Sequence, residues 1–269
     1  MDIEYVGERP ALHRLKELIG IESVKKEVES FIAVAEMNKR RVNQKLESTP
    51  LSLHSLFLGN PGTGKTSVAR LIGEILFEKG VVSKEDFIEV SRSDLVGSHI
   101  GHTAIKTRKI LEAALDGVLF IDEAYTLSTG GEKDFGIEAI NEILTFMENH
   151  RSNIVIIFAG YTKDMEKFLE MNDGLRSRVP NHFHFPDYSI EDLVQIGLID
   201  LSQKKYSLNE EIYRKLIKHK YDQSYDHSNG RWARNVNDLI TRKMALRLSN
   251  QPDAPVEEIL DEDLIALMN

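Results

Sequence analysis

The sequence contains no cysteine. Disulfide bonds and thiolate metal ligands are therefore excluded, and a reducing cytosol suits such a chain. No apolar run is long enough to cross a bilayer, and the first residues lack the basic and apolar regions of a signal peptide. These absences predict a cytoplasmic protein without a membrane partner.

Basic side chains are outnumbered by acidic ones. The chain carries 34 Lys and Arg side chains against 43 Asp and Glu, which gives a formal charge of −9. Nucleic-acid binding depends mainly on Lys and Arg at phosphate groups, so this balance disfavours a nucleic-acid partner. Apolar residues make up 41% of the 269 residues, enough for a core domain with a smaller second domain.

The most specific pattern is Gly59-Asn60-Pro61-Gly62-Thr63-Gly64-Lys65-Thr66, which fits G-x-x-x-x-G-K-[ST] at each required position. An apolar segment at 53–58 precedes it, and apolar residues at helical spacing follow from Ser67 to Leu76. The order strand, glycine loop and helix predicts a phosphate-binding loop rather than a chance turn.

Each residue type in this loop has a chemical reason. Glycines let successive backbone amides point at an anion, and the start of the following helix adds the positive end of its dipole. Lys65 supplies charge for the β- and γ-phosphates, and the Thr66 hydroxyl can bind Mg²⁺. We therefore expect ATP to contact the whole segment: Asn60, Pro61, Gly62, Thr63, Gly64, Lys65, Thr66 and Ser67.

A second pattern places two acids after an apolar strand, Val118 to Ile121 followed by Asp122 and Glu123. Ligands of parallel sheets bind at the carboxyl ends of the strands, so both acids fall at the expected place. Asp122 is predicted to hold Mg²⁺, and Glu123 to orient and deprotonate the attacking water. Glu123 distinguishes a hydrolase from a protein that only binds the nucleotide.

Short apolar segments alternate with helical patterns through the first two thirds of the chain. We expect strands at 53–58, 87–90, 117–121, 154–159 and 183–185, with helices at 104–115 and 137–148. Uninterrupted apolar strands between helices predict an α/β fold whose parallel sheet is covered on both faces.

Past Pro186 only helical patterns follow, at 191–204, 209–219 and 232–248. We therefore expect an α/β nucleotide-binding core over 1–188, with residues 1–14 as a short arm. A small all-helical domain should occupy 189–269.

The sequence resembles the AAA+ ATPases, and within them the group that contains red-type Rubisco activase and stage V sporulation protein K. The resemblance runs from about Leu15 to Leu267, and its motifs are Gly59 to Thr66, 94–97, 100–103, 118–125, 131–136, 159–161, 175–178 and 185–188. It implies a five-stranded P-loop core with a helical lid. It also implies a ring, commonly a hexamer of identical chains, with ATP sites between subunits.

By this resemblance, Arg178 is similar to the arginine finger that reaches the γ-phosphate of the neighbouring subunit. Arg176 is the second candidate, because the two arginines flank Ser177 just before a strand. Chemically, such a finger supplies positive charge to the transition state from outside its own site.

Other family roles fall on the lid and on two short segments. Arg234 resembles the lid arginine that binds the γ-phosphate, with Arg231 close by in sequence. Ile19 and Gly20 lie where the family holds adenine. Tyr161 occupies the sensor position, where the family often has Asn or Thr.

The segment that would face the central pore reads Gly97-Ser98-His99-Ile100-Gly101. The related group usually has an aromatic residue at the position of His99, which grips a substrate polypeptide. Histidine is planar but more polar, so we expect a weaker apolar grip in which Ile100 takes a larger share.

Three functional hypotheses follow from these residues. The first is an ATP-driven remodeller of an unidentified protein client, similar to Rubisco activase or to sporulation protein K. The second is a nucleotide-gated assembly factor whose slow hydrolysis times the release of a partner, and His99 favours it. The third, a nucleic-acid motor, is disfavoured by the acidic charge.

Overall fold

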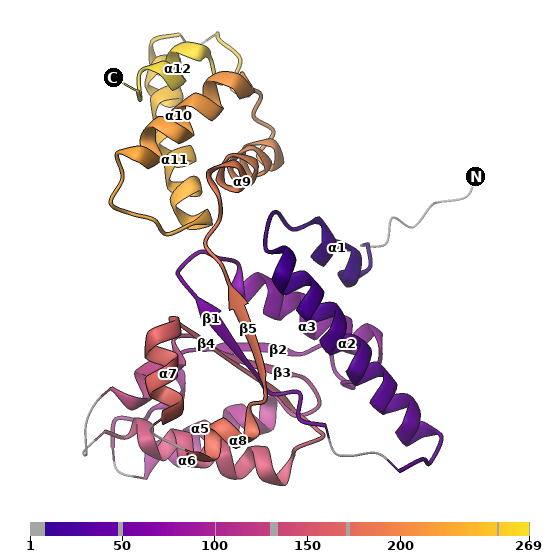
Figure 1. The fold of residues 1–269 in the computed structure, drawn as a ribbon. Helices are drawn as coiled ribbons and strands as arrows, with labels where there is room; N and C mark the ends of the chain where they lie inside the picture. Colours follow the sequence, from indigo (N-terminus) through magenta and orange to yellow (C-terminus); the bar gives the residue numbers. More distant parts are fainter. Residues whose placement is uncertain are drawn as a thin grey trace. The chain divides into compact units, whose positions relative to one another are not determined.

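The structure is a computed structural model that describes residues 9–47, 51–99, 101–129, 134–170, 173–251 and 253–268, apart from the side chain of Asp173. It divides into two compact units (Figure 1). The core unit comprises residues 1–18, 22–59 and 64–185, and the lid unit comprises 19–21, 60–63 and 186–269. Among the described residues, no helix has the length and apolar character needed to span a membrane.

The core unit is built on one five-stranded sheet. Its strands are β1 (Ser55–Gly59), β2 (Phe87–Val90), β3 (Val118–Ile121), β4 (Val155–Gly160) and β5 (Asn181–Phe185). They lie in the order β2-β3-β4-β1-β5, and all neighbouring pairs are parallel. The predicted five-stranded parallel sheet is confirmed.

Helices cover both faces of this sheet (Figure 1). They are α1 (Ala11–Glu17), α2 (Glu22–Asn43), α3 (Lys65–Glu78), α5 (His102–Ala113), α6 (Gly136–Asn149), α7 (Thr162–Glu170) and α8 (Asp173–Arg178). On one face, Phe31 of α2 meets Phe183 of β5 edge to face, with ring centroids 5.6 Å apart.

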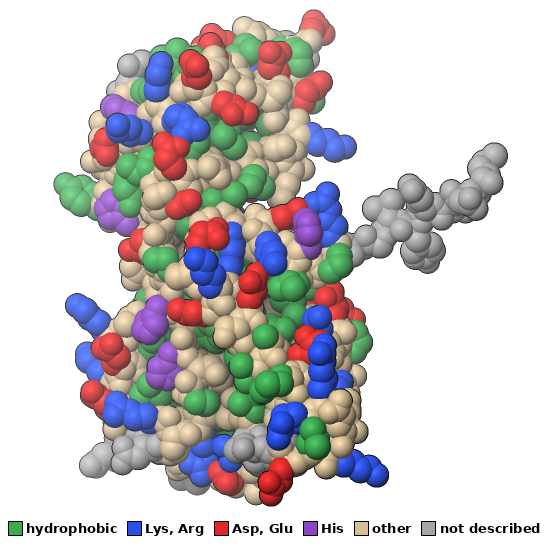
Figure 2. Space-filling model, turned by 45° about the vertical axis from the view of Figure 1, so that its right-hand side comes forward, with side chains coloured by type: hydrophobic (Ala, Val, Ile, Leu, Met, Phe, Trp, Pro, Cys, Tyr) green, Lys and Arg blue, Asp and Glu red, His purple; other side chains and the backbone are tan. Residues whose placement is uncertain are grey.

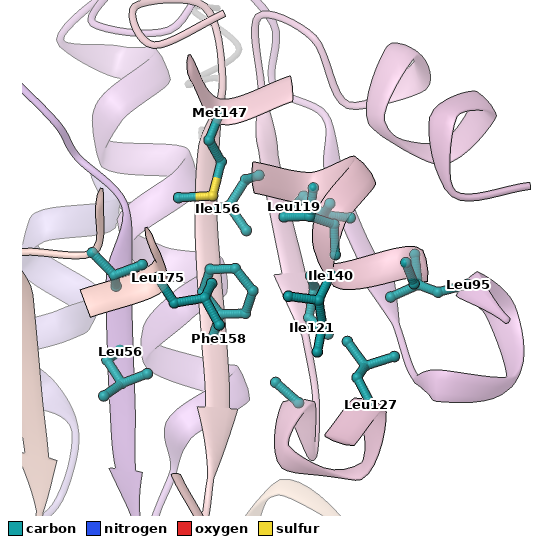
Figure 3. Packing of buried hydrophobic residues seen from close by; sticks show 14 of the residues in the cluster. Leu56, Leu95, Leu119, Ile121, Leu127, Ile140, Met147, Ile156, Phe158 and Leu175 are labelled. Atoms are coloured by element: carbon teal, nitrogen blue, oxygen red, sulfur yellow. The ribbon is translucent and has the colours of Figure 1, made fainter. Parts of the chain in front are cut away.

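The other face carries an apolar cluster, drawn in Figure 3. Leu56, Leu119, Ile156 and Phe158 come from alternate positions of three strands and are at most 1% exposed. Helix α6 adds Met147 and Ile140, and neighbouring segments add Leu175, Leu95 and Leu127. Each such side chain contributes roughly 1.5–3 kcal/mol on burial, so this cluster holds the strand ends in place.

Some short elements were absent from the sequence-based expectation: α4 (Arg92–Leu95), the 3₁₀ segment η1 (Ala124–Ser128), α7, α8 and α12 (Asp261–Ile265). Helix α4 has only four residues, too few for a helical period to be seen. It is fixed locally, because Asp94 Oδ2 accepts hydrogen bonds from the Ser91 N–H at 2.9 Å and the Ser91 hydroxyl at 2.8 Å.

The lid unit is helical, with α9 (Ile190–Gln203), α10 (Glu210–Asp222), α11 (Gly230–Asn250) and α12. Its buried centre includes Tyr213, whose hydroxyl donates to Asn237 Oδ1 at 2.7 Å. Asn237 in turn donates to the Gly197 carbonyl at 2.9 Å. A Cβ at position 197 would lie 1.8 Å from the Tyr213 oxygen, so glycine is required for α9 to pack here.

His54 lies directly before β1 and is 1% exposed. Its Nδ1 accepts a hydrogen bond from the Ile156 N–H at 3.1 Å, which ties the start of β1 to β4. Burial, together with the positive charge of Arg151, lowers the pKa of His54 from 6.5 to about 4. The imidazole is therefore neutral at pH 7.

This shift predicts a pH-dependent stability. Because the folded-state pKa lies below the unfolded value, the contribution is fully present above pH 6.5 and is lost as the pH falls toward about 4. The free energy of unfolding should fall by about 2 kcal/mol more between pH 7 and pH 5 in the wild type than in His54→Asn. Asparagine keeps an acceptor but does not titrate.

Urea unfolding followed by circular dichroism measures this difference. His184→Asn, at an exposed position of β5, is the matched control and should behave as the wild type does. Equal pH dependence in wild type and His54→Asn would contradict the account.

Candidate functional site

The parallel strands bring the predicted catalytic segments to one edge of the sheet. The glycine loop follows β1, the two acids follow β3, and Tyr161 follows β4. Because the strands are parallel, their carboxyl ends meet at this edge. Within the core unit, Lys65 and Thr66 are therefore gathered there with Asp122 and Glu123, although 56 positions separate Thr66 from Asp122 in sequence.

The glycine loop has the backbone that phosphate binding requires. Gly62 and Gly64 have φ of 71° and 92°, in the left-handed region that favours glycine. Helix α3 begins immediately after, at Lys65, and no side chain caps its first turn. The amides of that turn are therefore available to phosphate oxygens. Lys65 Nζ donates to the Gly59 carbonyl at 2.8 Å, and Ser67 is exposed on the same turn.

Glu123 has an unusual backbone. Its φ of 47° and ψ of 43° are left-handed, a region that costs a non-glycine residue about 1 kcal/mol or more. Two hydrogen bonds to its carbonyl hold this conformation, from the Thr126 N–H at 2.8 Å and the Thr126 hydroxyl at 2.7 Å. The Glu123 N–H donates to Asp122 Oδ1 at 3.0 Å. The exposed Glu123 side chain thus leaves the strand end in a fixed direction.

A second anchor of this segment was missed by sequence reasoning. The Arg92 guanidinium donates to the Thr126 carbonyl at 2.6 Å and forms an ion pair with Asp134 at 2.5 Å. The Asp134 side chain is only 4% exposed. The pair therefore links α4 to the segment that follows Glu123, a contact that no local pattern could reveal.

Tyr125 and Tyr161 form a ring pair beside the acids, with centroids 5.6 Å apart. Burial and the negative charge of Glu123 raise the pKa of Tyr125 to about 12. The phenol is therefore protonated at neutral pH and can donate a hydrogen bond. Tyr161 directly follows β4, and its role as sensor stays a prediction, whereas the contribution of Tyr125 was not predicted.

The residues of this edge suit a magnesium ion. Mg²⁺ prefers hard oxygen ligands, and the Thr66 hydroxyl and the Asp122 carboxylate are of that kind. A nucleotide bound on the loop would supply phosphate oxygens as further ligands. The donor set is therefore consistent with an ATP–Mg²⁺ site.

Arg178 and Arg176 lie at the opposite edge. Arg178 is the last residue of α8 and precedes β5. Its Nε donates to Glu148 Oε2 at 3.0 Å, and its Nη1 donates to the Gly174 carbonyl at 3.2 Å. Arg176 is exposed and has no hydrogen bond or ion pair to any residue that the structure describes. The structure does not bring either arginine to the Glu123 of the same chain.

The lid unit assembles other predicted residues. Gly20, with φ of 62°, packs against the ring of Tyr188, whose hydroxyl donates to the Thr63 carbonyl at 3.3 Å. Burial raises the pKa of Tyr188 to about 12, while the nearby positive charge of Arg234 acts to lower it. The loop residues of this unit are further held by Asn229, which donates to the Pro61 carbonyl at 3.2 Å.

Asp187 completes that arrangement, since it accepts hydrogen bonds from Asn229 at 2.8 Å and from Asn60 at 2.9 Å. Gly62 is also enclosed here, because a Cβ on it would lie 2.1 Å from the Ser228 carbonyl oxygen. Sequence reasoning identified Arg234 and Arg231 in this region but not Asn229, whose contacts join residues 168 positions apart.

Residues 55–187 match the family described as "ATPase family associated with various cellular activities (AAA)", and residues 189–269 match the AAA lid domain. The chain belongs to the AAA ATPase family. It is an enzyme that hydrolyses ATP with Mg²⁺ as cofactor.

This AAA ATPase is similar to several named proteins. It is 44% identical to stage V sporulation protein K of Bacillus subtilis over 236 residues, 86% of this chain and 73% of that protein. It is 43% identical to the chloroplastic ribulose bisphosphate carboxylase/oxygenase activase of Cyanidioschyzon merolae over 241 residues, 88% of this chain and 82% of the relative. The subgroup indicated by the sequence motifs is thereby confirmed.

Solved structures support the fold. The AAA domain of FIGL-1 in complex with ADP aligns with a TM-score of 0.67 at 16% identity, covering 93% of this chain and 82% of that one. RuvB of Thermotoga maritima aligns with a TM-score of 0.65 at 20% identity, covering 94% and 70%.

The segment predicted to face a pore lies between α4 and α5. The Gly97 N–H donates to Thr103 Oγ1 at 3.0 Å, and the rings of His99 and His102 are nearly perpendicular, 5.4 Å apart. Ile100 and residues 131–133, which carried part of the resemblance, lie outside the described residues.

The ATPase gives a direct test of Glu123. In Glu123→Gln, ATP turnover should fall by about 100-fold or more, because glutamine cannot accept the water proton, while ATP binding is retained. Thr126→Val loses the hydroxyl bond that orients Glu123 and should lower turnover by a smaller factor. Phosphate release and equilibrium nucleotide binding measure the two effects.

Glu112→Gln, at an exposed position of α5, is the control and should keep wild-type turnover. A Glu123→Gln variant that turns over ATP at the wild-type rate would remove the assigned role.

Proposed function

We propose that this ATPase works as a ring of identical subunits, six as is common in the family, that hydrolyses ATP at sites shared by neighbouring subunits and uses the energy to remodel a protein client. The observation that carries the proposal is the position of Arg178, at the sheet edge opposite Lys65 and Glu123.

The distance between the two edges of the sheet keeps Arg178 away from the ATP site of its own chain. Strand β5 has five residues, and at about 3.3 Å per residue it separates the two edges by roughly 16 Å. An arginine side chain extends less than half of that distance, so Arg178 cannot serve the ATP site of its own chain. Its present partner Glu148 has a side chain 60% exposed, and such surface pairs contribute only about 0–1 kcal/mol. Loss of the Arg178–Glu148 pair, when Arg178 binds a phosphate on a second copy instead, would therefore cost only about 0–1 kcal/mol.

In the proposed mechanism, Lys65 and the loop amides of residues 62–67 bind the phosphates, while Thr66 and Asp122 would hold Mg²⁺. Glu123 orients and deprotonates the attacking water. Arg178 of the neighbouring subunit then stabilises the charge that develops on the transferred phosphoryl group.

The remaining assignments concern nucleotide binding. Arg234 is proposed to bind the γ-phosphate, and Tyr161 to act as the sensor after β4. Ile19 and Gly20 would offer backbone and apolar surface to adenine. The packing of Gly20 on Tyr188 within the lid unit supports this last role.

A protein client is supported by the relatives, one of which is by name a Rubisco activase. A nucleic-acid client is less well supported. On the face shown in Figure 2, Lys and Arg side chains are interspersed with Asp and Glu side chains rather than gathered into a basic band. The segment 97–101 is the surface proposed to act on the client.

Subunit mixing tests the shared site. Lys65→Ala and Arg178→Ala should each abolish turnover as pure proteins, because each removes one half of every site. In a 1:1 mixture that exchanges subunits, about a quarter of the sites pair an intact Lys65 with an intact Arg178, so about a quarter of wild-type turnover should return.

Arg176→Ala is the control in that experiment and should retain most of the turnover by itself. A mixture that stays inactive while the two variants co-assemble would refute catalysis across subunits, and activity in pure Arg178→Ala would refute the finger.

A second candidate, a nucleotide-gated assembly factor with slow hydrolysis, is favoured by His99, which replaces an aromatic residue. The comparison of His99→Ala with His99→Tyr distinguishes the remodeller from the assembly factor. A remodeller should lose client activity in the alanine variant and gain it in the tyrosine variant at unchanged basal turnover. Client activity that is unaffected by both would favour the assembly factor.

A further inference from the structure

The carbonyl groups of the glycine loop, from residue 59 to residue 63, all accept hydrogen bonds. Two of the donors belong to the loop itself. Lys65 Nζ donates to the Gly59 carbonyl at 2.8 Å, and Thr63 Oγ1 donates to the Asn60 carbonyl at 2.8 Å. The donors to the other three carbonyls, those of residues 61–63, come from positions 188 to 230, far along the chain.

These three contacts lie within the lid unit, to which loop residues 60–63 themselves belong. One is made by a backbone amide and two are made by side chains. The donors and acceptors are Asn229 Nδ2 to the Pro61 carbonyl at 3.2 Å, the Gly230 N–H to the Gly62 carbonyl at 3.1 Å, and the Tyr188 hydroxyl to the Thr63 carbonyl at 3.3 Å.

The direction of each carbonyl fixes the direction of an amide. In a trans peptide, the C=O of one residue and the N–H of the next lie in one plane and point in opposite directions. The contact from Asn229 therefore turns the Gly62 N–H away from Asn229, and the contact from Tyr188 turns the Gly64 N–H away from Tyr188. Neither N–H has an acceptor among the residues that the structure describes. Such backbone amides suit an anion.

Asn229 is held so that its donor faces the loop. Its Oδ1 accepts from the Tyr188 N–H at 2.8 Å, and its Nδ2 donates to Asp187 Oδ1 at 2.8 Å. These partners determine which end of the amide is the donor, because a carboxylate only accepts and an N–H only donates. The other hydrogen lies between the carbonyls of Pro61 and His227, each 3.2 Å from Nδ2. Asn229 is 3% exposed, so these contacts are shielded from water.

The backbone of Asn229 is strained. Its φ of 56° and ψ of −129° lie outside the regions that residues with a Cβ ordinarily adopt. Glycine would adopt these angles with less strain. The side-chain contacts of Asn229 therefore compensate for an unfavourable backbone, and a glycine at this position would remove the contacts while it suits the same backbone.

We propose that Asn229 and Tyr188 are positioning residues for ATP binding and hydrolysis, which hold the loop carbonyls outward so that the Gly62 and Gly64 amides stay directed at the phosphate groups of the nucleotide. Without these donors, a peptide of the loop is free to turn and present its carbonyl oxygen to a phosphate, which repels it. Amides that are aligned before binding need no reorganisation when the nucleotide arrives.

Equilibrium binding of ADP and of adenosine to the full chain tests this role. Asn229→Gly removes both donor hydrogens and should weaken ADP binding about tenfold, because hydrogen bonds from amides to a charged phosphate become misaligned. Tyr188→Phe removes one long hydrogen bond and should weaken ADP binding about threefold. Adenosine carries no phosphate, so both variants should bind it as the wild type does. KM for ATP should rise by the same factors as the affinity for ADP falls.

Tyr213→Phe is the matched control. It also removes a buried hydroxyl of the lid unit, which donates to Asn237 Oδ1 at 2.7 Å, but that bond involves no loop residue. This variant should unfold at a lower urea concentration and keep the wild-type affinity for ADP. A merely structural role of Asn229 and Tyr188 would give the same pattern as this control.

Wild-type ADP affinity in both Asn229→Gly and Tyr188→Phe would overturn the proposal. Equal losses of ADP and adenosine affinity would also overturn it, because the two residues would then act on the base or on lid packing rather than on the phosphates. If urea unfolding shows that Asn229→Gly does not fold, Tyr188→Phe decides the matter alone. None of these measurements depends on Arg178 or on the proposed ring.

Discussion

The parallel direction of the five strands is the constraint on which the site depends. It places every strand's carboxyl end at one edge and every amino end at the other, so the core unit has two chemically different edges. Lys65 and Glu123 collect at the first edge, and His54 and Arg178 at the second. Catalysis that uses groups from both edges, as proposed for Arg178, would therefore require a second molecule.

The parts of the fold that the sequence predicted are those encoded locally. The central strands β3 and β4 are the clearest case, because residues buried on both faces must be apolar throughout. The edge strands β2 and β5 also carry exposed polar residues, such as Glu89 and His184. The glycine loop could also be recognised from the sequence, since Gly62 and Gly64 adopt backbone angles that other residues rarely adopt. Asp122 and Glu123 could be assigned to the carboxyl end of a strand because the apolar strand before them was predicted.

The parts that could not be predicted depend on contacts between distant segments. Arg92 and Asp134 lie 42 positions apart, and neither belongs to a pattern that indicates an ion pair. The left-handed backbone of Glu123 depends on Thr126, whose hydroxyl is one of many in the sequence. The sequence alone could not distinguish Arg176 from Arg178, because both flank Ser177. Their surroundings differ, because only Arg178 is directed onto Glu148 and the Gly174 carbonyl.

The lid unit contains the only tryptophan of the chain, Trp232, which is 4% exposed. Its indole N–H donates to Ser224 Oγ at 3.1 Å, and its ring meets Tyr221 nearly at right angles. Trp232 is two positions from Arg234, on the first turns of α11. Intrinsic fluorescence excited at the indole band is therefore a label-free optical probe of one unit alone, placed beside a residue that is proposed to sense the nucleotide.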